Sequence, residues 1–195
     1  MEVLLPRPFE AYSIRNISKI IKIDYSLVHK TIKKLIEKKL VKAKKIGKSL
    51  SCQLNLSADP QLLAISSLIH SQKLLNKAGF GFVIDEIREK LADLIYIMIL
   101  FGSYAKGTAT RKSDIDLLFI VQNEADIDKT KKRIVSVISE TNIKIEFEVI
   151  TVEWLIKMFE ERHTVGREVL EGSIILHGAE QYYTLVKAYD KKRGH

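Results

Sequence analysis

The chain has little of what secreted and membrane-spanning proteins need. Cys52 is the only cysteine among 195 residues, so no disulfide can form within the chain. The longest unbroken apolar run, Leu94 to Phe101, is far shorter than the roughly 20 residues of a membrane-spanning helix. The first residues also lack the basic start and long apolar stretch of a secretory signal. We therefore expect a cytoplasmic protein without a membrane partner.

Acidic residues are scarce at one end of the chain. Residues 1–58 contain 13 Lys and Arg against 4 Asp and Glu, whereas residues 59–195 contain 19 against 20. The net charge of +8 therefore resides in the first third. Such asymmetry indicates a module that binds a polyanion, joined to a part with another task. A solvated basic face would have the same composition.

The basic part has the pattern of two helices and a hairpin. Residues 17–23 and 25–39 carry apolar side chains at helical spacing, and Asp24 between them is a suitable N-cap. Alternating residues on both sides of Gly47 predict two antiparallel strands. This order, with its best match over Asp24–Val41, resembles the winged-helix DNA-binding family.

The resemblance implies that the second helix enters the major groove of double-stranded DNA. The expected DNA-binding residues are Ser26, His29, Lys30 and Lys33 on this helix, and Lys44, Lys45 and Lys48 on the wing. Lysines give salt-sensitive affinity without sequence information. Residues 24–56 contain no Arg, so the bidentate guanine contact is not available from this segment. A winged helix that binds protein or dimerises would have the same pattern.

A third helical pattern begins at Asp59-Pro60 and ends at Gly79. Its apolar residues are Leu62, Leu63, Ile65, Ile69 and Leu74. This helix could pack on either part of the chain or pair with the same helix of a second copy, and we expect a homodimer. We predict a winged-helix domain over 1–58, a linking helix over 59–80 and a second domain over 81–195.

From residue 81 onward, helical and extended patterns alternate. Extended patterns cover 94–101, 114–121, 142–151 and 173–177. Helical patterns cover 83–92, a short stretch near 103, 126–140, 152–162, 165–171 and 181–192.

The motif Gly102-Ser103, followed after ten residues by Asp114-Ile115-Asp116, stands between two of these strands. Gly102 lets a substrate approach the backbone, Ser103 offers a hydroxyl and an N–H at a helix start, and Lys106 adds positive charge. Asp114 and Asp116 are two apart on a strand and share one face, so they repel each other unless a cation lies between them. Such oxygen ligands suit Mg²⁺, which also binds substrate phosphates.

A third carboxylate is expected from the strand over 144–150. Glu146 and Glu148 alternate there with apolar residues that face the other way. We expect Glu146 to be a metal ligand or base, with Glu148 as its neighbour or substitute. A solvated strand face would have the same alternation.

The segments Gly102–Gly107 and Ser113–Leu117 resemble the polymerase-beta type of nucleotidyltransferase, and most closely its minimal branch. Lys106 stands where that branch usually has Arg, which keeps the charge but loses the planar fork. The third acid is Glu where Asp is usual. The resemblance covers roughly residues 84–183. Together with the winged helix, it implies an α+β chain: a winged helix-turn-helix followed by a mixed sheet backed by helices.

The resemblance also implies a site and a reaction. Two Mg²⁺ ions would bind Asp114, Asp116 and Glu146, and an NTP, which we expect to be ATP, would bind Gly102, Ser103 and Lys106. The reaction would transfer AMP to a hydroxyl group of a HEPN-type toxin (as in toxin–antitoxin pairs), of a small molecule or of a nucleic-acid end. The alternative is a DNA-binding transcription regulator whose transferase domain senses a nucleotide without turnover.

Overall fold

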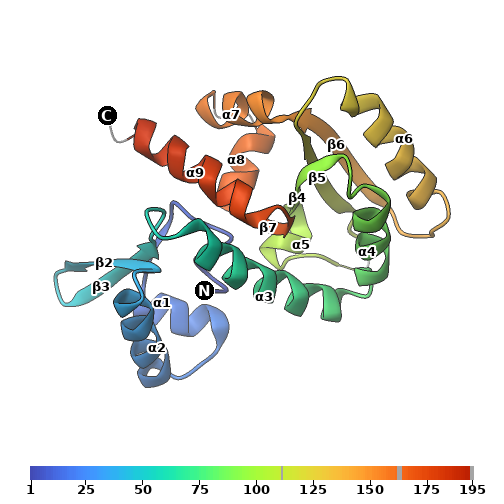
Figure 1. Cartoon of the computed structure of the whole chain (residues 1–195). Coiled ribbons are helices and arrows are strands. Elements are labelled where there is room, and N and C mark those ends of the chain that lie inside the picture. Colours follow the sequence, from blue (N-terminus) through green and yellow to red (C-terminus); the bar gives the residue numbers. More distant parts are fainter. Residues whose placement is uncertain (111, 162–163, 194–195) are drawn as a thin grey trace.

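The structure is a computed structural model that describes residues 1–110, 112–161 and 164–193. The N-terminal part contains β1 (Ala11–Ser13), α1 (Ile14–Ile21), α2 (Tyr25–Glu37), β2 (Val41–Ile46) and β3 (Ser49–Leu54), and α3 (Pro60–Ala78) follows. The remaining helices are α4 (Gly81–Lys90), α5 (Gly102–Lys106), α6 (Asp126–Ile138), α7 (Val152–Glu160), α8 (Thr164–Glu171) and α9 (Ala179–Arg193). The remaining strands are β4 (Ile95–Phe101), β5 (Ile115–Val121), β6 (Ile145–Thr151) and β7 (Ile174–His177). Figure 1 labels these elements.

The two helices and the hairpin predicted for the basic part are confirmed. Lys22 adopts a left-handed conformation with φ of 53° and ends α1. The Asp24 side chain accepts a hydrogen bond of 2.8 Å from the Ser26 N–H and so caps α2. Gly47, with φ of 59°, turns β2 into β3. β1 joins this hairpin to give an antiparallel sheet in the order β1-β3-β2.

The second sheet is mixed, as predicted, and has the order β6-β5-β4-β7. β4 pairs antiparallel with both β5 and β7, whereas β5 and β6 are parallel. The parallel pair needs a crossover connection, which α6 supplies. Strands β4 and β5 are buried over almost their full length because helices cover both faces of the sheet.

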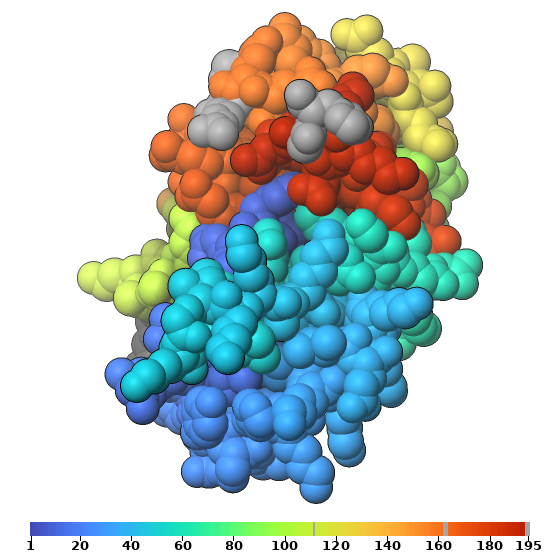
Figure 2. Space-filling model, turned by 90° about the vertical axis from the view of Figure 1, so that its left-hand side faces the viewer, coloured from blue at the N-terminus to red at the C-terminus, as the bar shows by residue number. Residues whose placement is uncertain are grey.

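Each face of this sheet has its own core. On one face, α4 and α6 pack with residues such as Met98 and Phe119. On the other face, α7, α8 and α9 enclose Ile99 and Leu118, and this core continues into buried residues of the basic part, such as Leu4. Figure 2 shows the N-terminal elements in blue and cyan against the C-terminal elements in orange and red. The predicted division into domains stays a prediction.

Helix α3 packs on α9 and β7, which is one of the arrangements that the sequence left open. Its buried residues are Leu63, Ser67, Ser71 and Leu75, spaced by four, and a hydrogen bond joins Ser67 to the Tyr183 hydroxyl. The serines are small and let α9 approach closely. Leu62, Ile65 and Ile69, which belong to the predicted apolar residues, lie outside this packed face and are 45%, 57% and 52% exposed.

No helix within the ranges that the structure describes is both long enough and apolar enough to cross a membrane.

Candidate functional site

The acidic residues meet at the end of the sheet where β4 ends and β5 and β6 begin. Phe101, the last residue of β4, is paired with Asp116. The parallel register of β5 and β6 then places Glu146 opposite Asp116, whereas Glu148 is opposite Leu118. The sequence did not decide whether Glu146 or Glu148 lies beside the aspartates. The register pairs Glu146 with Asp116.

Gly102 lies directly against Asp116. Its φ of 67° is in the left-handed region, and an added Cβ would lie 1.9 Å from the Asp116 Oδ2. The Ser103 N–H donates a hydrogen bond to the Asp116 carboxylate. Glycine is therefore required for its backbone conformation and for the close approach of the carboxylate.

The turn after Gly102 is anchored on both sides. Tyr104 makes an edge-to-face contact with Phe80, with ring centroids 5.1 Å apart. Gly107 ends α5 with φ of 72°, and the Thr108 N–H donates a hydrogen bond of 3.0 Å to the Ser103 carbonyl. These contacts fix Ser103 beside the acidic residues.

The site has an excess of negative charge around Asp116. Partial burial raises the pKa of the Asp116 carboxyl, and repulsion from Glu146, Asp114 and Glu168 raises it further. Glu168 comes from α8, and no sequence motif marked it. Its approach could not be predicted because it depends on how α8 packs against the sheet.

Lys144 supplies positive charge to this site and was not among the predicted site residues. Its ammonium group forms an ion pair with the Asp114 carboxylate and lies 3.8 Å from the Glu146 Oε1. The hydrogen bond to Asp114 raises the pKa of Lys144. The available signal was its spacing, because residues two apart on a strand share one face.

Lys106, which we predicted to bind the nucleotide, forms an ion pair with Glu168. The Lys106 Nζ lies 3.5 Å from the Glu168 Oε2, and both side chains are about one-third exposed, at 38% and 34%. The lysine is thus held beside the acidic residues by α8 and remains open to solvent.

The chemistry of the donor set fits a divalent cation. Carboxylate oxygens are the ligands that Mg²⁺ prefers, and the carboxyl groups of Asp114, Glu146 and Glu168 repel that of Asp116. The Lys144 ammonium already lies between two of them. Within the described ranges, no group of three or more His, Cys, Asp or Glu side chains is arranged closely enough to hold a metal ion. The metal ligands therefore stay a prediction.

The predicted DNA-binding residues lie at the surface of the basic part. Six are exposed: Ser26, Lys30 and Lys33 on α2, and Lys44, Lys45 and Lys48 on the hairpin or its turn. His29 is half-buried and stacks on Tyr25, with ring centroids 5.9 Å apart. This stacking leaves His29 less accessible than the lysines.

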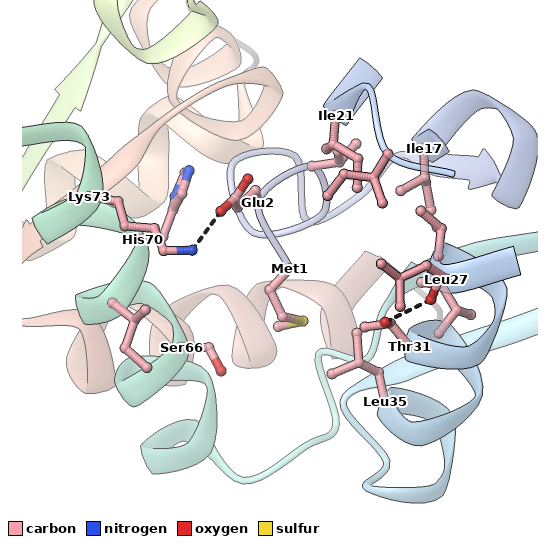
Figure 3. Close-up of a pocket in the computed structure, with 15 residues that line it drawn as sticks. Met1, Glu2, Ile17, Ile21, Leu27, Thr31, Leu35, Ser66, His70 and Lys73 are labelled. Carbon is pink, nitrogen blue, oxygen red and sulfur yellow. Dashed lines mark hydrogen bonds and ion pairs between the residues drawn. The ribbon is translucent and has the colours of Figure 1, made fainter. Parts of the chain in front are cut away.

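A cavity of about 370 Å³ lies away from the acidic residues, between α1, α2, α3 and the N-terminal segment (Figure 3). Ile21, Leu27 and Ile69 contribute apolar walls, and an ion pair of 2.9 Å between Lys73 and Glu2 lies at one end. None of the residues lining this cavity belongs to the site around Asp116.

The glycine–serine turn and the carboxylates beside it lie at one end of the mixed sheet. Residues 83–176 match the family model described as "Nucleotidyltransferase domain", and this range extends from α4 to β7. The comparison supports the nucleotidyltransferase superfamily for this part of the chain.

Two individual proteins are also similar. The chain is 44% identical over 52 residues to "Putative protein adenylyltransferase MJ1305" of Methanocaldococcus jannaschii, and the alignment spans 27% of this chain and 35% of that protein. The crystal structure of "a putative nucleotidyltransferase from Sulfolobus solfataricus" has 21% sequence identity and a TM-score of 0.31. The match covers 51% of this chain and 78% of the Sulfolobus solfataricus chain.

Proposed function

We propose that the chain is a metal-dependent nucleotidyltransferase that transfers AMP from ATP to a hydroxyl acceptor. The observation that carries this proposal is the register that sets Asp116 opposite Glu146, with Gly102 packed directly against Asp116. A purely structural strand end would not require neighbouring carboxyl groups that repel Asp116, or a glycine packed directly against it.

Each residue then has a role in the reaction. Asp114, Asp116 and Glu146 would hold two Mg²⁺ ions, which supply Lewis acidity to the α-phosphate and the acceptor hydroxyl. The Ser103 hydroxyl and N–H would bind the β- and γ-phosphates. Lys106 would add positive charge there, and Glu146, with a side chain 64% exposed, can accept the proton of the acceptor.

We further propose a protein hydroxyl as the acceptor. The relative from Methanocaldococcus jannaschii carries the words protein adenylyltransferase in its name. A HEPN-type toxin is the partner that the resemblance to minimal nucleotidyltransferases suggests. The exposed position of Glu146 is compatible with an acceptor as large as a protein.

The N-terminal part would bind double-stranded DNA as a winged helix. The order of its elements and the β1-β3-β2 sheet support this proposal. So does the exposure of Lys30 and Lys33 on α2 and of Lys44, Lys45 and Lys48 on the hairpin and its turn. Contacts from lysine to phosphate would give affinity that falls with salt.

Label transfer tests the enzyme. The full chain is incubated with Mg²⁺ and α-labelled ATP, alone and with candidate acceptors, as wild type and as Asp114→Ala/Asp116→Ala. The matched control is Glu124→Ala/Asp128→Ala, which removes two exposed acids away from the site. We expect transfer by the wild type and the control, and none by the first variant. Equal transfer by all three proteins would refute the proposal.

A second candidate is a DNA-binding regulator that senses a nucleotide without turnover. The ion pairs of Lys106 with Glu168 and of Lys144 with Asp114 favour it, because both cations are already engaged by protein carboxylates. This candidate predicts that ATP binds and changes the affinity for operator DNA, while no label transfer occurs with any acceptor.

We also propose a homodimer that pairs α3 with α3. Leu62, Ile65 and Ile69 present apolar side chains on the outer side of this helix, and exposed patches of this kind often mark protein interfaces. A two-fold axis would bring the same uncharged face of each copy together.

A further inference from the structure

We propose that Lys144 is an internal cation that competes with the divalent metal for the carboxylates of Asp114 and Glu146. The inference rests on the proposed function, because it concerns the same acidic site. It assigns a role to a residue that belongs to neither the glycine–serine turn nor the three acids.

The backbone fixes where Lys144 can reach. The Lys144 carbonyl accepts a hydrogen bond of 3.0 Å from the Ile115 N–H, so Lys144 is beside the residue that follows Asp114. Lys144 directly precedes β6, and Glu146 is the second residue of that strand. The Lys144 backbone is thus placed beside both acids by this hydrogen bond and by the parallel register that begins at the next residue, and not only by a side-chain rotamer.

From this position the Lys144 side chain contacts both Asp114 and Glu146. Its Nζ contacts the Asp114 carboxylate and lies 3.8 Å from the Glu146 Oε1. Asp114 is shielded, with a side chain 24% exposed, whereas the Lys144 side chain is 71% exposed. Among the ion pairs in the described part of the chain, Lys144 contacts Asp114 and Glu146 but not Asp116.

In this geometry Lys144 competes with a divalent ion for the carboxylates, and the ion can displace it. A divalent ion bound by the three acids needs carboxylate oxygens that the ammonium group now engages. Because solvent surrounds most of the lysine side chain, it can move away without exposing a core. Lys144 therefore compensates the mutual repulsion of the acids when no metal is bound, and it lowers the apparent affinity for the metal.

The test is a calorimetric titration of the full chain with Mn²⁺ alone. Lys144→Met removes the charge and keeps the length of the side chain, Lys144→Arg keeps the charge, and Lys131→Met removes an exposed charge on α6 as the matched control. Since an exposed ion pair contributes at most about 1 kcal/mol, we expect Lys144→Met to bind Mn²⁺ roughly fivefold more tightly than wild type. Lys144→Arg and Lys131→Met should bind as wild type does.

Two further measurements separate direct competition from the general field of a nearby charge. The titrations are repeated at about 0.5 M KCl, where screening weakens an exposed contact and removes most longer-range effects, and the gain of Lys144→Met should shrink without disappearing. In metal-free buffer, Lys144→Met should melt at a lower temperature than wild type because the acids lose their cation.

The outcomes distinguish this inference from the proposed function. If Asp114→Asn/Asp116→Asn abolishes Mn²⁺ binding but Lys144→Met binds no more tightly than wild type, the inference is overturned and the metal site stands. A gain that disappears at high salt also overturns it. If wild type binds no Mn²⁺, or the double variant keeps it, the metal site and the inference are both wrong.

Discussion

A Cβ added to Gly102 would lie 1.9 Å from the Asp116 Oδ2, well inside van der Waals contact. Gly102→Ala must therefore displace the carboxylate and also hold a side chain at a φ of 67°. The left-handed backbone alone costs about 1–2 kcal/mol. We expect a loss of about 2 kcal/mol in the free energy of unfolding, measured in urea, and at least a tenfold loss of label transfer.

Gly107→Ala is the control for this prediction. Gly107 has nearly the same φ, 72°, but its Cβ would meet nothing within 4 Å. It should show the backbone cost of about 1 kcal/mol and keep most of the activity. Equal activity losses in both variants would mean that contact with Asp116 is not what Gly102 provides.

The positions of the helices and strands were largely predictable because their signals are local. Apolar runs marked the strands, and Asp24, Gly47 and Gly79 marked helix starts, turns and ends, as the structure confirms. The glycine–serine motif also placed Asp116 beside a turn. These residues act through their own backbone or their immediate neighbours in sequence.

The remaining features depend on contacts between distant segments. Ser67 and Ser71, two small polar residues, form the packed side of α3 because α9 lies close there. Glu168 reaches the acidic site through the packing of α8. The choice between Glu146 and Glu148 depended on the register of β5 and β6, which alternation within one strand does not determine.

Neutralising Asp116 should stabilise the metal-free protein. The pKa of Asp116 is raised in the folded state, so the ionised carboxylate lowers stability, and this loss appears as pH rises through the raised value. Asp116→Asn should therefore melt about 1–3 °C above wild type at pH 7. The difference should vanish in acid, below the ordinary value of 3.8, where the carboxyl is protonated in both states.

Melting curves of both proteins between pH 3 and pH 8, in buffer with chelator, check this prediction. Added Mg²⁺ should raise the melting temperature of wild type and not that of Asp116→Asn. A variant that melts below wild type at pH 7 would mean that the Ser103 N–H bond to Asp116 outweighs the repulsion from the other acids.

Lys106→Ala should weaken nucleotide binding with little effect on the fold. The ion pair with Glu168 is partly exposed, so its loss should change the free energy of unfolding by less than about 1 kcal/mol. Steady-state kinetics should show a roughly tenfold higher KM for ATP and a smaller change in kcat. Lys106→Arg should retain a KM close to that of wild type, and an unchanged KM in the alanine variant would remove Lys106 from the nucleotide site.

A charge on the outer side of α3 should dissociate the proposed dimer. Ile65 is 57% exposed, and Ile65→Lys would place two like charges near each other across a two-fold axis. Sedimentation should show a dimer for wild type and a 22.3 kDa monomer for this variant. Val135→Lys, at a site 55% exposed on α6, is the control and should remain dimeric. A monomeric wild type would refute the dimer.

Lys30→Ala/Lys33→Ala should weaken DNA binding in a manner that depends on salt. Each phosphate contact contributes about 0.9 to the slope of log K against log salt concentration, so losing two contacts should reduce the slope by roughly 2. Duplex binding is measured by fluorescence anisotropy from 50 to 300 mM KCl. Lys131→Ala/Lys132→Ala removes the same charge from exposed positions on α6 and should leave the slope unchanged. If both double variants lose the same affinity and slope, the binding reflects net charge alone and α2 is not a DNA-recognition helix.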